Sequence, residues 1–281
     1  MIGVGNLSVG GSGKSPMVMY LADYLAKNFR TGVLSRGYGR KTKGYGIVNY
    51  DSNFKMVGDE AMQLFERFKN RFVIGVCEDR VFGAKKIIED MDLDVLLLDD
   101  SYQHRRIKPG FNILLTDYND PYFKDFVLPA GNLRESRRGT KRADIIVVTK
   151  CPENITEEKK QFYISRIKPR YYQKVFFSTI NYDEEIFCFD PKLKLPDNNM
   201  SYYDILLITG IANPKTFVEE VKRYSSNVKH LRFKDHHSFT TEDISLIKKE
   251  YEKLGEYKLI LTTEKDYVRL KGFDYLREKL Y

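Results

Sequence analysis

The sequence predicts an α/β protein with a P-loop-type, mostly parallel sheet that has helices on both faces, followed by a smaller C-terminal α/β domain. The first observation is the alternation of short apolar runs with helical segments along the first two thirds of the chain. The second is the opening of the chain, where a short strand, a glycine-rich turn and a helix follow one another. Such sheets bind ligands at the carboxyl ends of their strands.

Each expected element follows from its period and its bounding residues. In the first part, apolar runs predict strands at 1–5, 31–35, 71–76, 94–98, 111–116, 143–149 and 174–179. Helical segments between them cover 17–27, 58–69, 79–90 and 156–167. A second unit has expected strands at 205–209, 229–233 and 258–262 and helices at 214–224 and 241–254. We therefore divide the chain into a core domain (1–182), a linker (183–202) and a smaller domain (203–281), which we expect to close over the site at the strand ends.

Composition limits the classes of function. The 281 residues carry 47 Lys and Arg against 39 Asp and Glu, a net charge of +8 that suits a nucleotide, an acidic substrate or an anionic membrane surface. Zinc-finger spacing and aromatic RNA-binding signatures are missing from the sequence, so we expect no nucleic-acid partner. Three cysteines without metal or redox spacing indicate reduced thiols in a cytosolic protein. No apolar run is long enough for a membrane span, and we find no signal peptide.

The glycine-rich turn is one residue away from the phosphate-loop pattern Gly-x-x-x-x-Gly-Lys-Ser/Thr, because Ser8 takes the place of the first glycine. The expected nucleotide-binding residues are Ser8, Val9, Gly10, Gly11, Ser12, Gly13, Lys14 and Ser15. Backbone N–H groups at a helix N-terminus favour anions. Lys14 is expected to reach the terminal phosphates, and the Ser15 hydroxyl to hold Mg²⁺. A mobile glycine-rich turn is the alternative interpretation.

Acidic residues follow a buried strand at 95–98, in the form of a Walker B strand that delivers a carboxylate to Mg²⁺. These are Asp99 and Asp100, and a turn or N-cap residue is the alternative interpretation of Asp100. The run continues through Gln103 and His104 into two arginines, which is more functional chemistry than a structural loop usually holds.

The segment Gly58-Asp59-Glu60 opens a helix, and two interpretations of Asp59 are equally supported by the sequence. Its carboxylate could be an N-cap, or it could be the base that takes a proton from an attacking hydroxyl. The segment 134–142 carries five basic residues and one acid. A solvated loop is the simpler interpretation of this segment. In the functional interpretation, Arg134 contacts the transferring phosphate oxygens.

Two further segments bear on chemistry. Asp235-His236-His237 lacks a third ligand with metal spacing, so we expect an imidazole held by a carboxylate and supporting a catalytic acid or base. Residues 147–152 end in Thr-Lys-Cys-Pro. A guanine-binding site needs an aspartate where Pro152 stands, so the sequence favours ATP over GTP.

Together these segments resemble the tetraacyldisaccharide 4′-kinase (lipid A 4′-kinase) family over nearly the whole chain. The resemblance rests on residues 4–16, 34–40, 57–60, 99–104, 128–135, 142–144, 209–214, 235–237 and 262–266. It implies transfer of the ATP γ-phosphate to the 4′-hydroxyl of a membrane-embedded tetraacyldisaccharide 1-phosphate, giving lipid IVA. Ser101-Tyr102 stands where the family usually has Gly-Phe, and the family's usual N-terminal hydrophobic helix is absent.

Residue by residue, the resemblance implies a site. Asp59 matches the presumed base, His236 its partner, and Arg134 a further active-site position. The implied metal positions are Ser15, Asp99, Asp100 and Glu135, with ATP and Mg²⁺ as cofactors. We expect peripheral attachment at the cytoplasmic face of the bacterial inner membrane, and no obligate protein partner is evident. The alternatives are a phosphotransferase acting on a soluble small molecule and an ATP-switched binding protein.

Overall fold

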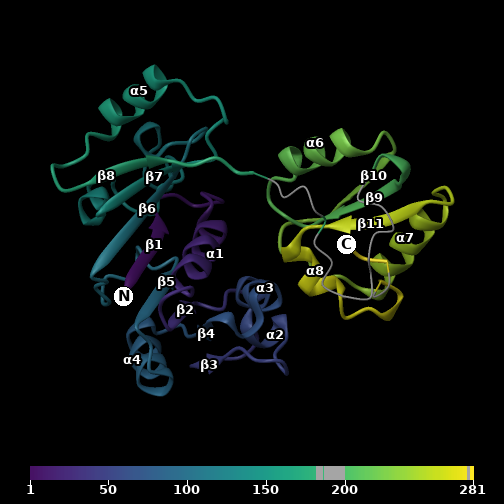
Figure 1. Ribbon diagram of the computed structural model, residues 1–281, viewed down its shortest axis with the longest axis horizontal. Helices are drawn as coiled ribbons and strands as arrows, with labels where there is room; N and C mark the ends of the chain where they lie inside the picture. Colours follow the sequence, from purple (N-terminus) through teal and green to yellow (C-terminus); the bar gives the residue numbers. More distant parts are fainter. Residues whose placement is uncertain (182–185, 187–199, 277–278) are drawn as a thin grey trace. The chain divides into compact units, whose positions relative to one another are not determined.

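The computed structural model describes residues 1–181, 186, 200–276 and 279–281. The chain forms two compact units, Met1–Tyr182 and Asp183–Tyr281 (Figure 1). Most of the predicted linker at 183–202 lies outside the described residues, and its last residues, Met200–Tyr202, form the short 3₁₀ helix η4.

The first unit is built on an eight-stranded sheet with the order β3-β4-β2-β5-β1-β6-β7-β8. The strands are β1 (Ile2–Asn6), β2 (Thr31–Ser35), β3 (Gly46–Ile47), β4 (Val73–Val76), β5 (Val95–Asp99), β6 (Phe111–Asp117), β7 (Ile145–Thr149) and β8 (Lys174–Phe177). All neighbours are parallel except the pair β3 and β4. The predicted mostly parallel α/β fold is therefore confirmed. The two-residue edge strand β3 was not predicted, since so short a run carries no periodic signal.

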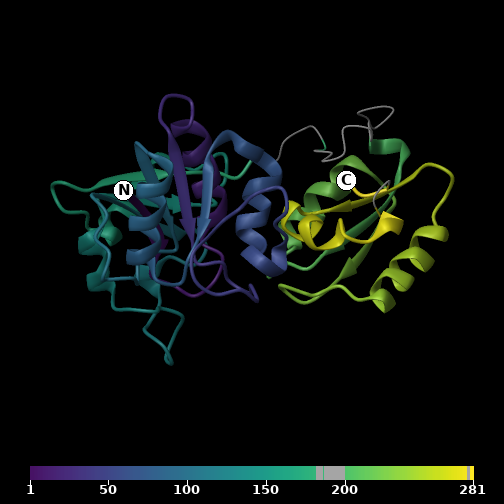
Figure 2. The same ribbon diagram turned by 90° about the horizontal axis from the view of Figure 1, so that it is seen from below.

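Helices cover both faces of this sheet (Figures 1 and 2). They are α1 (Lys14–Leu25), α2 (Phe54–Val57), α3 (Asp59–Phe68), α4 (Arg80–Met91) and α5 (Glu157–Ile167), with 3₁₀ turns η1 (Lys69–Arg71), η2 (Tyr122–Lys124) and η3 (Arg137–Arg142). Alternate residues of a strand point to opposite faces. Leu96 and Leu98 of β5 pack in one cluster with Ile87 of α4. Leu97 between them is buried on the opposite face, the side of the sheet where α1 packs on β1, β2 and β5.

The second unit has a three-stranded parallel sheet with the order β10-β9-β11. Its elements are β9 (Asp204–Thr209), α6 (Lys215–Tyr224), β10 (Val228–Arg232), α7 (Thr241–Glu252), β11 (Lys258–Thr262), α8 (Glu264–Leu270) and η5 (Asp274–Leu276). Leu206 packs in a cluster with Ile247 of α7, and its neighbour Leu207 packs in another with Val221 of α6. Both faces of this sheet are therefore buried.

In the part of the chain that the structure describes, no helix combines the length and the apolar character needed to cross a bilayer. Both sheets are parallel in their centres, so each brings the carboxyl ends of its strands to one edge. In each sheet, the functional residues predicted from the sequence follow strands that end at this edge.

Candidate active site

The phosphate loop lies between β1 and α1, as predicted. Gly10 and Gly13 have φ angles of 107° and 80°, in the left-handed region that favours glycine. Gly13 is the N-cap of α1; no side chain caps this helix, and no acidic residue lies in its first turn. The first N–H groups of α1 are thus left for an anion. The Lys14 Nζ atom lies 4.0 Å from an Asp100 oxygen and donates to the Gly10 carbonyl at 3.5 Å.

The end of β7 holds the phosphate loop in place. The Thr149 hydroxyl donates to the Ser12 carbonyl at 2.9 Å, and Lys150 donates to the Gly11 carbonyl. The Lys150 ammonium is paired with Asp117 at 2.7 Å, so it is fixed between β6 and the loop. The loop is thus anchored from a neighbouring strand as well as through its own helix.

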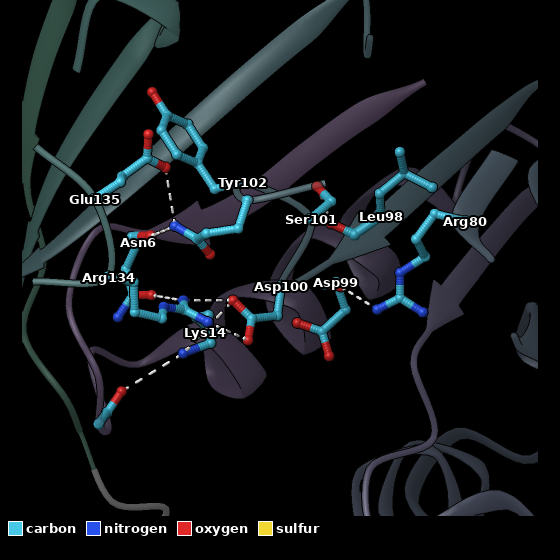
Figure 3. Close-up of polar contacts among 12 residues, drawn as sticks. Asn6, Lys14, Arg80, Leu98, Asp99, Asp100, Ser101, Tyr102, Arg134 and Glu135 are labelled. Carbon is cyan, nitrogen blue, oxygen red and sulfur yellow. Dashed lines mark hydrogen bonds and ion pairs between the residues drawn. The ribbon is translucent and has the colours of Figure 1, made fainter. Parts of the chain in front are cut away.

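Two consecutive carboxylates at the end of β5 lie in opposite electrostatic settings (Figure 3). Burial, together with the charges of Glu60 and Asp100, raises the pKa of Asp99 to about 7. Its Oδ1 atom is buried and has no hydrogen-bond partner among the described residues. Burial also acts to raise the pKa of Asp100, but hydrogen bonds from Arg134 and the charge of Lys14 hold it below its usual value. The Asp100 carboxylate is therefore held in an ion pair with Arg134, whereas the Asp99 carboxylate keeps one oxygen without a hydrogen-bond partner among the described residues.

Backbone geometry sets the positions of these side chains. Val4 of β1 pairs with Asp99 in the sheet, which places the carboxylate beside the strand that leads into the phosphate loop. Asp100 has a φ angle of 45°, in the left-handed region that non-glycine residues seldom adopt. Lys14 and Arg134 lie on the Asp100 side of the pair, and Arg80 lies on the Asp99 side (Figure 3).

Arg80 is a buried cation behind the carboxylates. Its guanidinium donates to the carbonyls of Cys77 and Asp99, each at 2.8 Å. Burial lowers its pKa to about 10, against the opposing effect of the nearby acidic groups. Arg80 therefore ties the end of β5 to the end of β4 and adds positive charge behind Asp99.

Arg134 and Glu135 belong to different clusters although they are neighbours in the sequence. Arg134 donates to both oxygens of Asp100, at 2.7 and 3.1 Å, and to the Asn6 side chain. Arg105 and Arg142 both donate to Glu135, at 3.1 and 2.7 Å. The Gln103 amide also donates to the Glu135 carboxylate.

Asp59 is the first residue of α3, and the N-cap of that helix is Gly58, which has a φ angle of 90°. The N-cap interpretation of Asp59 is therefore wrong. Asp59 is nonetheless buried, in the first turn of the helix, where the helix dipole favours a negative charge. The next residue, Glu60, accepts a hydrogen bond from the Ser15 hydroxyl at 3.3 Å, which places the start of α3 beside the phosphate loop.

In the second unit, the two adjacent histidines have different surroundings. The His237 ring stacks on Phe233 and bonds Asp243 at 2.8 Å, and Asp243 also belongs to the capping box of α7. His236 has a φ angle of 56°, and its Nε2 atom lies 3.1 Å from the Lys265 Nζ. His237 is thus part of the packing of this unit, and His236 stands on a strained backbone after β10. A cavity of about 350 Å³ is lined by 211–212 and 232–235 at the same strand ends.

Comparisons with known proteins assign the family. The sequence profile of the family described as tetraacyldisaccharide-1-P 4′-kinase matches residues 1–280. The chain belongs to this family. A tetraacyldisaccharide 4′-kinase of Flavobacterium johnsoniae is 43% identical over 282 residues, covering 100% of this chain and 80% of the relative. One of Bacteroides thetaiotaomicron is 42% identical over 294 residues, covering 100% and 76%.

A solved structure of the Aquifex aeolicus family member LpxK, in complex with ATP, is similar to the whole chain. Its TM-score is 0.71 at 31% identity, over 99% of this chain and 80% of that one. The family predicted from the sequence is confirmed by these comparisons, and ATP as the nucleotide of the family agrees with the prediction.

In this kinase family member, Lys14 and Arg134 both contact Asp100, and Asp99 lies beside Asp100 (Figure 3). The structure gives Glu135 a different setting, because two guanidinium groups and an amide occupy the carboxylate. We therefore do not carry the metal-ligand interpretation of Glu135 forward. Four residues at this site had no assigned role in the sequence analysis: Asn6, Glu60, Arg80 and Lys150. Asn6, Glu60 and Lys150 lie inside sequence segments named above, whereas Arg80 gave no signal beyond its charge.

The residues present fit Mg²⁺ with a nucleoside triphosphate. The Ser15 hydroxyl and the unpartnered Asp99 oxygen are hard oxygen donors, which Mg²⁺ prefers. Among the described residues, no cluster of three or more His, Cys, Asp or Glu side chains could hold a metal by itself. Mg²⁺ commonly binds one or two carboxylates and completes its shell with water and substrate phosphates.

Proposed function

We propose that this chain is an ATP-dependent kinase that phosphorylates the 4′-hydroxyl of tetraacyldisaccharide 1-phosphate to give lipid IVA. The proposal rests on two features of a chain that belongs to this kinase family. The buried Asp99 carboxylate has an oxygen without a hydrogen-bond partner among the described residues, and no side chain caps the helix that follows the phosphate loop. Buried polar atoms in folded proteins are usually hydrogen-bonded, and a bound cation would supply the partner that this Asp99 oxygen lacks among the described residues.

The geometry of the phosphate loop supports the phosphate-binding roles. We propose that residues 8–15 cradle the phosphates, with Lys14 on the terminal phosphates. Ser15 and Asp99 would hold the metal, with Asp100 nearby in its bidentate pair with Arg134. Bound there, Mg²⁺ would supply positive charge to the phosphate oxygens. Arg134 is placed to exchange Asp100 for a phosphoryl oxygen as charge develops, since guanidinium groups bind both anions bidentately.

Proton transfer is assigned to Asp59. As the sugar oxygen forms its bond to the γ-phosphorus, the bridging oxygen leaves with ADP and the hydroxyl proton passes to the Asp59 carboxylate. The burial of Asp59 at the start of a helix that is tied to Ser15 through Glu60 supports this role. His236 as the residue that supports this base is a proposal that rests on the resemblance and on the structural role of His237.

The acceptor is a lipid, so the enzyme must meet a membrane. We propose peripheral attachment to the cytoplasmic face of the inner membrane, through basic residues and anionic headgroups. The structure refines which basic residues are available for this contact. Arg134 and Arg142 of the segment 134–142 are paired with Asp100 and Glu135.

The test is transfer of labelled γ-phosphate to the purified acceptor in detergent micelles, with ATP and then GTP as the donor. We expect transfer that needs a divalent cation, stops in EDTA and prefers ATP. Hydrolysis that is independent of the acceptor, or full activity in EDTA, would contradict the proposal. A strong preference for GTP would contradict the nucleotide assignment.

A further inference from the structure

A short turn beside the active site exposes consecutive apolar residues. Residues 126–130 read Phe-Val-Leu-Pro-Ala, and all five are exposed. Phe126 and Leu128 leave 64% and 53% of their surface in contact with solvent. A run of exposed apolar side chains is unfavourable in water unless it meets another surface.

The turn, which we call the apolar turn (126–130), is a built structure. Leu133 donates to the Phe126 carbonyl at 2.9 Å, and Leu128 donates to the Leu133 carbonyl at 3.0 Å. The Asp125 carboxylate accepts from the N–H groups of Phe126 and Asn132. These bonds close the base of the turn, so the apolar side chains are held outward by a defined backbone.

Glycine is required at the end of the turn. A Cβ atom at Gly131 would lie 2.2 Å from the Asp125 carboxylate and 2.5 Å from the Phe126 carbonyl. The close approach of these groups keeps the two sides of the turn together.

Basic residues stand next to the apolar turn. Arg137 donates to the Asp125 carbonyl, and its guanidinium lies 5.6 Å from the centre of the Phe126 ring. Arg138 and Lys141 are exposed on the same 3₁₀ turn, η3. A shallow cavity of about 380 Å³ is lined by apolar Phe126, Val127 and Leu133, by polar residues 136–138 and by Asp125, whose carboxylate is bonded to backbone N–H groups. Apolar side chains that project beside a basic rim match the layered chemistry of an anionic bilayer surface.

The apolar turn is tied to the phosphate loop. Val9 of that loop donates to the Asn132 carbonyl at 2.7 Å, and Ser8 forms a bridge with Leu133. Arg134, the next residue, donates through its backbone to Leu7 at 2.6 Å and through its side chain to Asp100. A membrane that meets the apolar turn would therefore lie near the phosphate donor.

We propose that the apolar turn (126–130) inserts into the headgroup region of an anionic bilayer, while Arg137, Arg138 and Lys141 contact lipid phosphates. This rests on the proposed function, in which the acceptor lies in the bilayer, and it names the surface that meets the membrane. The hydrogen bonds between residues 132–134 and residues 7–9 then fix where the phosphate loop lies relative to the bilayer.

Tryptophan fluorescence tests the insertion directly, because the chain contains no tryptophan. The Phe126→Trp variant is mixed with vesicles of phosphatidylcholine alone or of phosphatidylcholine with phosphatidylglycerol. We expect a blue shift of the emission with the anionic vesicles, and quenching by brominated acyl chains. The control is Tyr171→Trp, at a fully exposed position on the turn that leads to β8, which should not shift.

Vesicle affinity tests the contributions of the two kinds of residue. The double variant Phe126→Ser/Leu128→Ser should bind anionic vesicles roughly tenfold or more weakly. Arg138→Gln/Lys141→Gln should lose roughly fivefold per charge and most of its dependence on salt. Transfer to the acceptor in detergent micelles should be retained by both variants, since these exposed side chains lie outside the catalytic group. Unchanged melting temperatures establish that the variants fold.

The outcomes separate this inference from the proposed function. Loss of transfer on vesicles with retention in micelles supports the inference. Binding of vesicles without an emission shift in the Phe126→Trp variant overturns it, because another surface must then meet the bilayer. A shift caused by the acceptor lipid in micelles but not by anionic vesicles also overturns it and assigns the turn to acyl-chain binding. Failure of transfer in micelles by the wild type contradicts the kinase proposal and leaves the fluorescence test intact.

Discussion

Each unit buries an aspartate near the carboxyl ends of its strands, and the two aspartates are held in different ways. Asp266, at the start of α8, accepts hydrogen bonds from the Gly210 backbone, the Thr263 hydroxyl and the Arg269 guanidinium at 2.8 to 3.1 Å. Asp99, at the end of β5, keeps one oxygen without a partner among the described residues. The Asp266 carboxylate therefore has hydrogen-bond partners on both oxygens without a ligand, whereas the Asp99 carboxylate does not. We infer that Asp266 stabilises its unit and that Asp99 is reserved for a bound cation.

The largest expected effect is on the phosphate-loop lysine. Lys14→Ala should lower phosphate transfer by roughly 10³-fold, because no other side chain would bring a positive charge to the terminal phosphates from this loop. The melting temperature should be retained, since the partly buried Lys14 ammonium makes only long contacts, at 3.5 Å to the Gly10 carbonyl and 4.0 Å to Asp100. Lys86→Ala, on the outer side of α4, is the matched control and should be fully active. Near wild-type transfer by Lys14→Ala would remove the assignment of the site to the first sheet.

Asp59→Ala should lower kcat by roughly 10²- to 10⁴-fold with little change in ATP affinity, because a base acts on the acceptor proton. His236→Ala should also lower kcat. Groups that act as one unit are non-additive, so the double variant should be little worse than the worse single variant. Single-turnover kinetics measure these losses, and multiplicative losses would mean that the two residues act independently. A preserved kcat in Asp59→Ala would end its assignment as the base.

Asp266, whose carboxylate is hydrogen-bonded on both oxygens, should contribute to the stability of the protein. Asp266→Asn should lower the free energy of unfolding by roughly 3 kcal/mol, because it leaves the buried Arg269 without its charged partner. Asp274→Asn, at an exposed position in η5, is the control and should change it by less than about 0.5 kcal/mol. Urea denaturation followed by circular dichroism measures both. A stability for Asp266→Asn equal to that of the control would contradict the structural role.

Asp99 should make the stability of the protein depend on pH in the opposite direction to an aspartate held in an ion pair. Its pKa is raised from the ordinary value of 3.8 to about 7, so the folded state binds more protons than the unfolded state in that range. Stability of the ligand-free protein should therefore fall as pH rises across the range, by up to a few kcal/mol. Asp99→Asn should lack this contribution. Equal pH slopes for the two proteins would show that Asp99 is not destabilised by burial.

Much of the first unit could be predicted from the sequence, because its signals are local. The run at 31–35 gave a strand with the observed bounds, and the phosphate loop identified its own strand and helix. Strand β3 and helix α2 were not predicted, since a two-residue strand and a one-turn helix carry little periodic signal. Helix α8 was not predicted, because its seven residues span only about two turns and carry little periodic signal.

The candidate site was predictable where one motif carried it, and less so where contacts are distant in sequence. The pairing of Arg134 with Asp100 joins residues 34 positions apart, and the clustering of Glu135 with Arg105 and Arg142 depends on how two loops fold together. A basic segment such as 134–142 looks uniform in sequence. The structure divides it into arginines that neutralise buried acids and cations that face solvent. That division is set by packing and is invisible in composition.

Ligand-induced stabilisation of Asp99→Asn tests the central comparison most directly. Melting temperatures of the wild type, Asp99→Asn and Asp266→Asn are measured without ligand, with ATP in EDTA, and with ATP and Mg²⁺. We predict that ligand-free Asp99→Asn melts at or above the wild-type temperature and loses the part of the ATP-induced shift that depends on Mg²⁺. Asp266→Asn should melt lower and keep that part of the shift. An Asp99→Asn protein that is destabilised and still responds fully to Mg²⁺ would contradict the account.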